Sequence, residues 1–423
     1  MAQIIQPTAD SLSPSARWRI VVMLMVFAAL AHFNRVGISV AGAEIFIKQI
    51  GITEVRMGWV YTAFLIVYTI GMLPGGWLID RIGSAKALTL LGLTMGTFVA
   101  LTGTLGWITD TPESLWLGLL VIRGLAGFCS APLHPGAAHA VHDVMHGPRR
   151  ATANGMVTAG ALIGIACCYP LFGWLMDRLS WPWAFVASGS VLAAYGVLWK
   201  LFASPLLPGP QPTDSAATAK KDSRASWSLL LDRNLWLLTL SYAAYSYLQY
   251  LFFYWMNYYF EEVLHVPKIE ARQISFYITL AQGAGMAFGG LSTDLVCRWF
   301  GKTGGRRGIV ITGMSLGALF GYIAVSRDDP WSVAACLAMS MATLGMCEGV
   351  FWTTATDVGG KSRGFSGAFM NTGGNVGGLI SPVLTPMLAK ELEWSGAITV
   401  ACIISGLGGL IWFVIEPREQ SET

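Results

Sequence analysis

Residues 75–83 read Gly-Gly-Trp-Leu-Ile-Asp-Arg-Ile-Gly, and residues 289–298 read Gly-Gly-Leu-Ser-Thr-Asp-Leu-Val-Cys-Arg. Each stretch follows a long apolar segment, and each places an aspartate four residues after its second glycine, with basic residues behind it. The two stretches are 214 residues apart, about half the chain, and Gly155 recurs as Gly367 at nearly the same offset. A pattern repeated at half the chain length predicts a protein built from two similar halves.

The composition indicates a membrane protein. Hydrophobic residues make up 54% of the 423 residues and charged residues only 12%, against about 25% charged residues in soluble domains. The length allows roughly a dozen spans of ~20 residues. Twelve apolar segments are predicted to span the membrane: 18–42, 56–79, 86–107, 114–142, 150–175, 182–202, 234–260, 271–297, 308–326, 331–357, 363–389 and 394–415. The fold class is therefore an all-α membrane protein of twelve transmembrane helices in two six-helix, pseudo-symmetric halves.

The chain is predicted to divide at a polar linker. A cytoplasmic tail, 1–17, precedes the first six-helix half, 18–202, and the second half occupies 233–415. Between the halves, residues 203–232 are rich in Pro, Ser, Ala and Lys, which favours a cytoplasmic linker over a folded domain. A short cytoplasmic tail, 416–423, ends the chain.

Lysine and arginine residues indicate the orientation of the helices. If the N-terminus is cytoplasmic, 18 of the 27 basic residues fall in inner loops and seven in outer loops. Because cytoplasmic loops carry an excess of basic residues, both termini are predicted to be cytoplasmic in a multi-pass protein of the cell (inner) membrane. The net charge of +3 reflects this bias, so it does not indicate a nucleic-acid partner. The lipid bilayer is an expected partner because of the predicted spans. We expect a monomer.

No pattern in the chain indicates enzyme chemistry. The seven cysteines fall within or at the ends of spans, and none has metal-ligand spacing with histidine. No nucleophile–base–acid set and no phosphate-binding glycine loop lies at a plausible depth. We therefore expect no catalytic residue, no metal and no cofactor. A sensor derived from a transporter is also disfavoured, because no signalling domain is appended.

Two basic residues remain within the predicted spans, Arg35 and Arg123. An arginine at mid-span costs at least about 2.5–3.5 kcal/mol on insertion scales, so it is tolerated only beside a partner or a wet cavity. One interpretation is that each arginine pairs with a neighbouring helix. The other is a site for an anion, because two arginines lie in one half and the planar guanidinium suits carboxylate or phosphate.

Four stretches resemble the anion:cation symporters of the major facilitator superfamily. Residues 32–41 (His-Phe-Asn-Arg-Val-Gly-Ile-Ser-Val-Ala) resemble that family's first-helix motif, and the likeness continues through 74–83 and 123–136 and returns in 371–378. It extends over all twelve segments. The family includes bacterial importers of sugar acids and related carboxylates, so the resemblance implies the major facilitator fold and such a substrate.

The resemblance also implies which residues contact the substrate. Arg35 and Arg123 are implied to belong to the site and its coupling machinery. Asn371 and Asn375 are implied to face the substrate from the second half. For Tyr68 and Trp352 ordinary helix packing is the alternative. The implied substrate-binding residues are Arg35, Arg123, Tyr68, Trp352, Thr353, Asn371 and Asn375.

Two positions depart from the family pattern. The family usually has an aspartate before the first arginine, where this chain has Asn34, and a glutamate seven residues after the second arginine, where this chain has Ser130. Those acids are the expected proton carriers, and neither an amide nor a hydroxyl titrates in the useful range. The ordinary scheme of proton coupling is therefore in doubt for this sequence.

Other titratable residues are candidates for coupling. Glu348 lies in the tenth span, where an acid is costly unless it is functional or paired. His134 lies between Pro132 and Pro135 in the fourth span, and histidine titrates near neutrality. Each has a structural alternative, a hydrogen bond for Glu348 and a packed side chain for His134. His32 is a weaker third candidate.

The repeated motif itself predicts a gate. Asp80 and Asp294 each end a helix beside basic loops, where an acid caps a neighbouring helix N-terminus and pairs with arginine. We interpret these aspartates, with Arg81 and Arg298, as gating residues that close the inner side.

The sequence as a whole predicts a secondary active transporter that works by alternating access. A small organic anion is expected to bind near the membrane midplane between the halves, coupled to a proton or a sodium ion, with import as the direction. An uncoupled facilitator or an exporter of organic anions or drugs is the main alternative.

Overall fold

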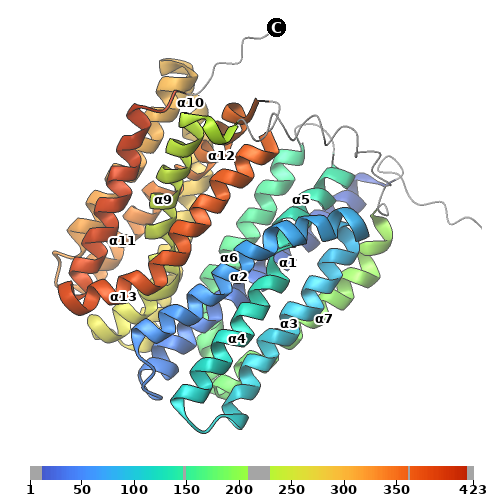
Figure 1. The fold of residues 1–423 in the computed structure, drawn as a ribbon, viewed down its shortest axis with the longest axis vertical. Helices are drawn as coiled ribbons and strands as arrows, with labels where there is room; N and C mark the ends of the chain where they lie inside the picture. Colours follow the sequence, from blue (N-terminus) through green and yellow to red (C-terminus); the bar gives the residue numbers. More distant parts are fainter. Residues whose placement is uncertain (1–11, 146–148, 208–228, 361–362, 417–423) are drawn as a thin grey trace, which may run out of the picture. The chain divides into compact units, whose positions relative to one another are not determined.

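The structure is a computed structural model that describes residues 12–145, 149–207, 229–360 and 363–416. It forms two compact units, Met1–Pro212 and Thr213–Thr423. The division falls within the segment predicted as a linker, most of which lies outside the described residues, as do the ends of both predicted tails. Every regular element among the described residues is a helix (Figure 1).

Seven α-helices make up the described part of the first unit. They are α1 (Pro14–Ala41), α2 (Glu54–Ile82), α3 (Ser84–Ile108), α4 (Pro112–Ser130), α5 (Leu133–Val144), α6 (Arg149–Leu179) and α7 (Trp181–Phe202). The π-helix η2 (Gly42–Ile47) extends α1, and the 3₁₀ turn η3 (Ser204–Leu206) follows α7. Because α4 and α5 are the two parts of one predicted span, the unit contains the six spans expected from the sequence.

The second unit repeats this plan with longer continuous helices. Its elements are η4 (Leu229–Leu231), α9 (Arg233–Tyr258), η5 (Tyr259–Val263), α10 (Lys268–Ala324), α11 (Pro330–Gly345), α12 (Glu348–Gly359), α13 (Arg363–Leu410) and η7 (Ile411–Phe413). The helices α10 and α13 each hold two predicted spans, joined at Gly301 (φ 74°) and at Glu393 (φ 60°). Gly83 (φ 82°) and Ser180 (φ 69°) turn the chain at the matching points of the first unit.

Ten helices in the described part of the chain are long and apolar enough to cross a membrane. One of them, 365–413, contains two of the predicted spans. The helix α9 is not among the ten, because tyrosines and polar residues such as Ser241 and Gln249 interrupt its apolar residues. The difference between ten and the predicted twelve therefore comes from one joined pair and one polar helix.

The same helix pairs form in both units. In the first, α1 packs against α6, α2 against α4, and α3 against α7. In the second, α9 packs against α13, and α10 against α11. Capping side chains begin several of these helices: Ser13 accepts a hydrogen bond from the backbone of α1, Asp232 from that of α9 and Asp329 from that of α11.

The first glycine of each repeated pair allows the second span of each unit to cross the fourth. A Cβ on Gly75 would lie 3.3 Å from the backbone nitrogen of Pro132, and a Cβ on Gly289 would lie within 2.5 Å of the backbone of Met346. Those partners lie where the fourth span breaks, between α4 and α5 and between α11 and α12. The repeated glycine pair therefore marks a backbone-to-backbone crossing at a helix break.

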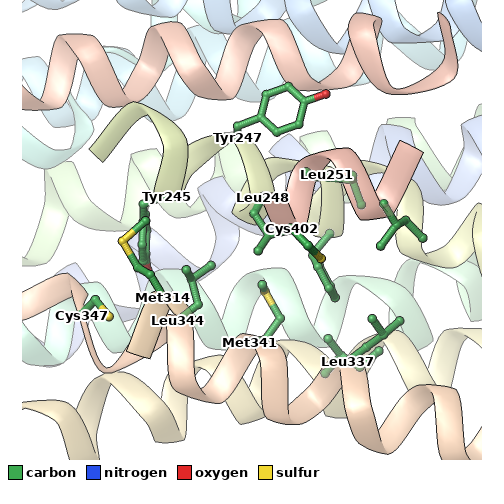
Figure 2. Packing of buried hydrophobic residues seen from close by; sticks show 14 of the residues in the cluster. Tyr245, Tyr247, Leu248, Leu251, Met314, Leu337, Met341, Leu344, Cys347 and Cys402 are labelled. Atoms are coloured by element: carbon green, nitrogen blue, oxygen red, sulfur yellow. The ribbon is translucent and has the colours of Figure 1, made fainter. Parts of the chain in front are cut away.

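Apolar side chains fill the interior of the second unit. Figure 2 shows Leu248 and Leu251 of α9 with Leu337, Met341 and Leu344 of α11, all of them buried. Burial of this kind stabilises the unit by about 1.5–3 kcal/mol for each large side chain, less what lipid contact already provides.

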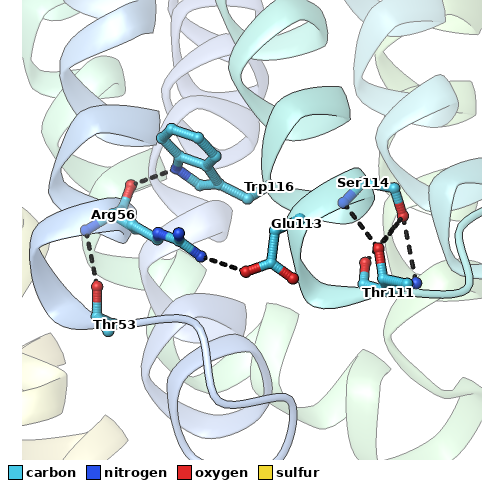
Figure 3. Close-up of polar contacts among 6 residues, drawn as sticks. All are labelled: Thr53, Arg56, Thr111, Glu113, Ser114 and Trp116. Atoms are coloured by element: carbon cyan, nitrogen blue, oxygen red, sulfur yellow. Dashed lines mark hydrogen bonds and ion pairs between the residues drawn. The ribbon is translucent and has the colours of Figure 1, made fainter.

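A polar clamp joins α2 and α4 at one end of the first unit (Figure 3). Nη1 of Arg56 lies 2.8 Å from Oε1 of Glu113, and Nε1 of Trp116 donates to the carbonyl oxygen of Arg56 at 2.9 Å. The Arg56 guanidinium carbon is also 5.2 Å from the centroid of the Trp116 ring. Since both charged side chains are exposed, solvent and salt screen the ion pair and it contributes little to stability.

Candidate functional site

Arg35 extends from α1 over two aromatic rings of α2. Its guanidinium carbon is 5.4 Å from the centroids of both Phe64 and Tyr68, and these two rings stack at 6.3 Å with an interplanar angle of 12°. Cation–π contacts of this kind hold a guanidinium in place without neutralising its charge. The sequence predicted Tyr68 beside the site but not Phe64, although their spacing of four residues on one helix face would have identified it.

Arg123 is fully buried and connects α4 to α1. Its Nη1 donates to the carbonyl oxygen of Asn34 at 3.2 Å, and its Nη2 donates to that of Arg35 at 2.6 Å. Its guanidinium carbon also lies 5.0 Å from the Phe64 ring centroid. Arg123 therefore fixes the backbone of α1 at the residue that bears the other arginine. Direct substrate contact by Arg123 stays a prediction.

A small cavity opens beside Arg35. The residues that line it come from five helices: Ala31, His32, Arg35, Phe64, Tyr68, Met95, Ser130, Leu133 and His134. None of these nine residues is acidic, whereas three of them carry basic side chains. The structure thus brings together five of the predicted residues, namely His32, Arg35, Tyr68, Ser130 and His134.

The two histidines of this cavity contact one another. Nε2 of His134 lies 3.4 Å from Nε2 of His32, and the ring centroids are 5.1 Å apart at an interplanar angle of 63°. His134 lies in the first turn of α5, just after the break in the fourth span, and His32 lies in α1. The weaker histidine candidate from the sequence is therefore the partner of the stronger one.

Asn34 and Ser130, at the two positions where the family pattern has acids, are engaged by backbone carbonyls. Nδ2 of Asn34 donates to Leu30 O at 2.9 Å and to Ser188 O at 3.4 Å, so the amide packs between α1 and α7. The Ser130 hydroxyl donates to Gly127 O at 2.8 Å. Both side chains act as hydrogen-bond donors here, a task that an ionised acid cannot perform.

Glu348 of the second unit accepts two hydrogen bonds. Its Oε1 lies 2.8 Å from the Tyr242 hydroxyl of α9 and 2.8 Å from Nε1 of Trp352, one turn further along α12. Its Oε2 is buried without a hydrogen-bond partner among the described residues. The sequence predicted Glu348 and Trp352 but missed Tyr242, because no spacing connects side chains on helices more than a hundred residues apart.

The remaining predicted contacts lie on α12 and α13. Trp352 is 39% exposed, and Thr353 is exposed with its hydroxyl donating to Gly349 O at 3.0 Å. Asn371 is half-buried and Asn375 is buried on α13. Their contact with a substrate stays a prediction.

The predicted gate is described only in part. The side chains of Asp80 and Asp294 lie outside the described residues. Arg81 is exposed, with its guanidinium carbon 5.1 Å from the Trp77 ring centroid, and Arg298 is exposed. The gating role of these residues stays a prediction. The sequence did not predict the ion pair between Arg306 of α10 and Asp357 of α12, whose Nη1 and Oδ2 atoms are 2.5 Å apart.

The offset of the repeated motif also relates the two sites. His134 and Glu348 are 214 residues apart, and each lies in the first turn after the break of the fourth span of its unit. The same offset relates the buried Arg123 to the buried Leu337. The two units thus have titratable side chains, His134 and Glu348, at equivalent positions. At the other pair of equivalent positions, the first unit has a buried arginine and the second a buried leucine.

Comparison with known proteins identifies the family. The profile described as Major Facilitator Superfamily matches residues 24–381. The chain is 26% identical to the probable galactarate/D-glucarate transporter GudP of Bacillus subtilis, over 96% of this chain and 95% of that protein. It is 24% identical to a D-galactonate transporter of Escherichia coli, over 94% and 95%. It is 28% identical to the probable sulfoacetate transporter SauU of Cupriavidus necator, over 94% and 93%.

Solved structures confirm the fold. The chain superposes on the crystal structure of a bacterial homologue of the human lysosomal transporter Spinster, in an inward-facing and unoccupied conformation, with a TM-score of 0.74. The match covers 96% of this chain and 98% of the other, at 14% sequence identity. The expected twelve-helix fold and the resemblance to sugar-acid and organic-anion transporters are both confirmed.

Proposed function

The chain belongs to the major facilitator superfamily of membrane transporters, and from this premise we propose that it moves a small organic anion, a sugar acid or related carboxylate, across the cytoplasmic membrane. Transport is by alternating access and is coupled to a cation in the direction of import. The observation that carries the proposal is the cavity lined by Arg35, whose nine lining residues include no acid.

The chemistry of this cavity favours an anion. The Arg35 guanidinium offers several donors in a plane, which matches the two oxygens of a carboxylate. Tyr68, Ser130 and the histidine rings add groups that hydrogen-bond to hydroxyls, and the relatives named above carry polyhydroxy acids or a sulfonated acid.

Coupling to a cation is supported by titratable groups in each unit. His134 lies on the same cavity as Arg35, and Glu348 occupies the matching place in the second unit. The gate formed by Asp80, Arg81, Asp294 and Arg298 completes the proposed cycle, in a monomer whose termini both face the cytoplasm.

An uncoupled facilitator or exporter is the second candidate. The observation that favours it is that Asn34 and Ser130 replace the usual acids and are held by backbone carbonyls. Under this alternative the same cavity binds the anion, but transport follows the gradient of the anion alone.

Uptake into membrane vesicles tests the proposal. Labelled galactarate, D-glucarate, D-galactonate and sulfoacetate are supplied without a gradient, with an inward proton gradient and with an inward sodium gradient. We expect saturable uptake of at least one of these acids, concentrated above the external level under one of the two gradients. Equilibration without accumulation would favour the facilitator. Vesicles that take up none of the four acids faster than vesicles lacking the protein would contradict anion transport.

A further inference from the structure

The hydrogen bonds of the two cavity histidines determine where their hydrogens lie. Nδ1 of His32 is 3.0 Å from the carbonyl oxygen of Ala28, and because a carbonyl oxygen only accepts, this nitrogen carries a hydrogen. Nε2 of a neutral His32 is then an acceptor. Nε2 of His134, 3.4 Å away, is consequently the donor. In the neutral pair, therefore, Nδ1 of His134 is the nitrogen that has no hydrogen.

We propose that the His32–His134 pair is the proton-binding site of this transporter, and that it takes up one proton together with the anion at Arg35. The proton adds to Nδ1 of His134. The hydrogen between the two Nε2 atoms can then lie nearer either ring, so the positive charge is shared by the pair. The inference rests on the proposed function and adds to it the identity and the place of the coupling ion.

The surroundings of the pair explain why proton and anion bind together. The charged or titratable groups that face it are Arg35 of α1 and Tyr68 of α2, while α3 and α4 contribute a thioether and a hydroxyl, from Met95 and Ser130. A proton on the pair places a second positive charge beside Arg35, which is unfavourable in a cavity without an acid. An anion at Arg35 removes that repulsion. By linkage, the proton must strengthen anion binding by the same factor.

The pair is also better placed for this task than the other titratable candidate. The pair lines the same cavity as Arg35, so a proton there and an anion at the arginine interact at short range. Glu348 belongs to the second unit, where its Oε1 accepts from Tyr242 and Trp352 and so connects α9 with α12. The histidine pair therefore supplies the titratable group that Asn34 and Ser130 lack.

Isothermal titration calorimetry of the purified full-length protein tests the inference. D-Galactonate is the probe, and galactarate, D-glucarate and sulfoacetate are titrated in the same way. Titrations in buffers of different ionisation enthalpy give the number of protons taken up with each anion. We expect about one proton per anion, and an affinity that weakens by up to about tenfold per unit rise in pH. His134→Gln and His32→Gln should take up no proton and should bind with an affinity that no longer changes with pH.

A matched control is available on the same helix. His142 of α5 is exposed, so His142→Gln should retain the wild-type proton count. Anion binding by the wild type without proton uptake would overturn the inference and leave the proposed function standing, as would proton uptake that persists in both histidine variants. Failure of all four acids to bind would overturn both proposals. Where one of the two glutamine variants does not fold, the proton count of the other variant decides whether the pair holds the proton.

Discussion

Arg35 and Arg123 have the same side chain but are held in different ways. Arg35 rests on the aromatic faces of Phe64 and Tyr68 and lines the cavity, whereas Arg123 is fully buried and donates to two carbonyl oxygens of α1. The first arrangement places the guanidinium in the lining of the cavity. The second uses the guanidinium to fix the backbone of α1 at Arg35, the residue that we propose binds the anion.

Replacement of the cavity arginine tests the first arrangement. Arg35→Lys keeps the positive charge but removes the planar fork, so it loses about one charged hydrogen bond, worth about 1.5–3 kcal/mol. Uptake of the organic anion at low concentration should fall by about 10- to 100-fold. Initial rates normalised to membrane abundance measure the effect, and Arg56→Lys at the exposed clamp is the matched control. A correctly inserted Arg35→Lys protein with near-normal uptake would contradict the assignment.

Restoring the usual acid of the first helix should be harmful in this chain. Nδ2 of Asn34 donates to the carbonyl oxygens of Leu30 and Ser188. Asn34→Asp replaces that donor with an oxygen that faces the same carbonyls, so it should destabilise the protein by about 1–3 kcal/mol. Thermal unfolding in detergent measures the loss, with Asn154→Asp on α6 as the control. A variant as stable as the wild type that also accumulates more substrate would show that the amide has no such role.

At the scale of helices, the two neighbouring glycines of the repeated motif differ in how closely other helices approach them. In the second unit, α10 approaches the backbone of Met346 so closely that only a glycine at position 289 fits. Gly290, the next residue, has no atom within 4 Å of an added Cβ. Gly289 is therefore required by the packing of the two helices, whereas no neighbouring atom requires a glycine at position 290.

A pair of alanine substitutions tests this difference. Gly289→Ala forces a methyl group to within 2.5 Å of the Met346 backbone, and overpacking of this kind costs about 1–3 kcal/mol. Gly290→Ala meets no atom and gains about 1 kcal/mol of helix propensity. We expect a lower unfolding temperature and lower uptake for Gly289→Ala only. Equal stability of the two variants would refute the close crossing.

The sequence predicted the helices well but only part of the site. Apolar runs located all six spans of each unit because a span in lipid needs about 20 apolar residues whatever its neighbours are. Arg35, His134 and Glu348 could be predicted because a titratable side chain is costly in a span. The four-residue spacing from Tyr68 would have identified Phe64. Tyr242 could not be singled out in the same way, because aromatic residues are common in spans and its role comes from Glu348 on another helix. The contact of Arg123 with α1 likewise depends on packing that no local pattern encodes.

At the scale of the whole transporter, the coupling proposals separate in an accumulation assay. His134→Gln should abolish accumulation under a proton gradient but leave counterflow exchange, because exchange needs binding and conformational change without net proton release. Glu348→Gln should keep both, because its remaining carbonyl oxygen still accepts from Tyr242 and Trp352. Reconstituted liposomes preloaded with substrate measure counterflow exchange, and liposomes without internal substrate measure accumulation. Loss of accumulation in Glu348→Gln alone would transfer the coupling role to the second unit.

The shared position of His134 and Glu348 has a consequence for the history of the chain. If the two halves descend from one duplicated ancestor, both copies began with the same residue after the break. The glycine that crosses the break was retained in each copy, where an added Cβ would lie within 2.5 Å of the Met346 backbone at Gly289 and 3.3 Å from the Pro132 nitrogen at Gly75. The residue after the break differs between the copies, so one copy carries a base and the other an acid. Duplication would thus have preserved the architecture in both halves while the two equivalent positions came to carry different titratable groups.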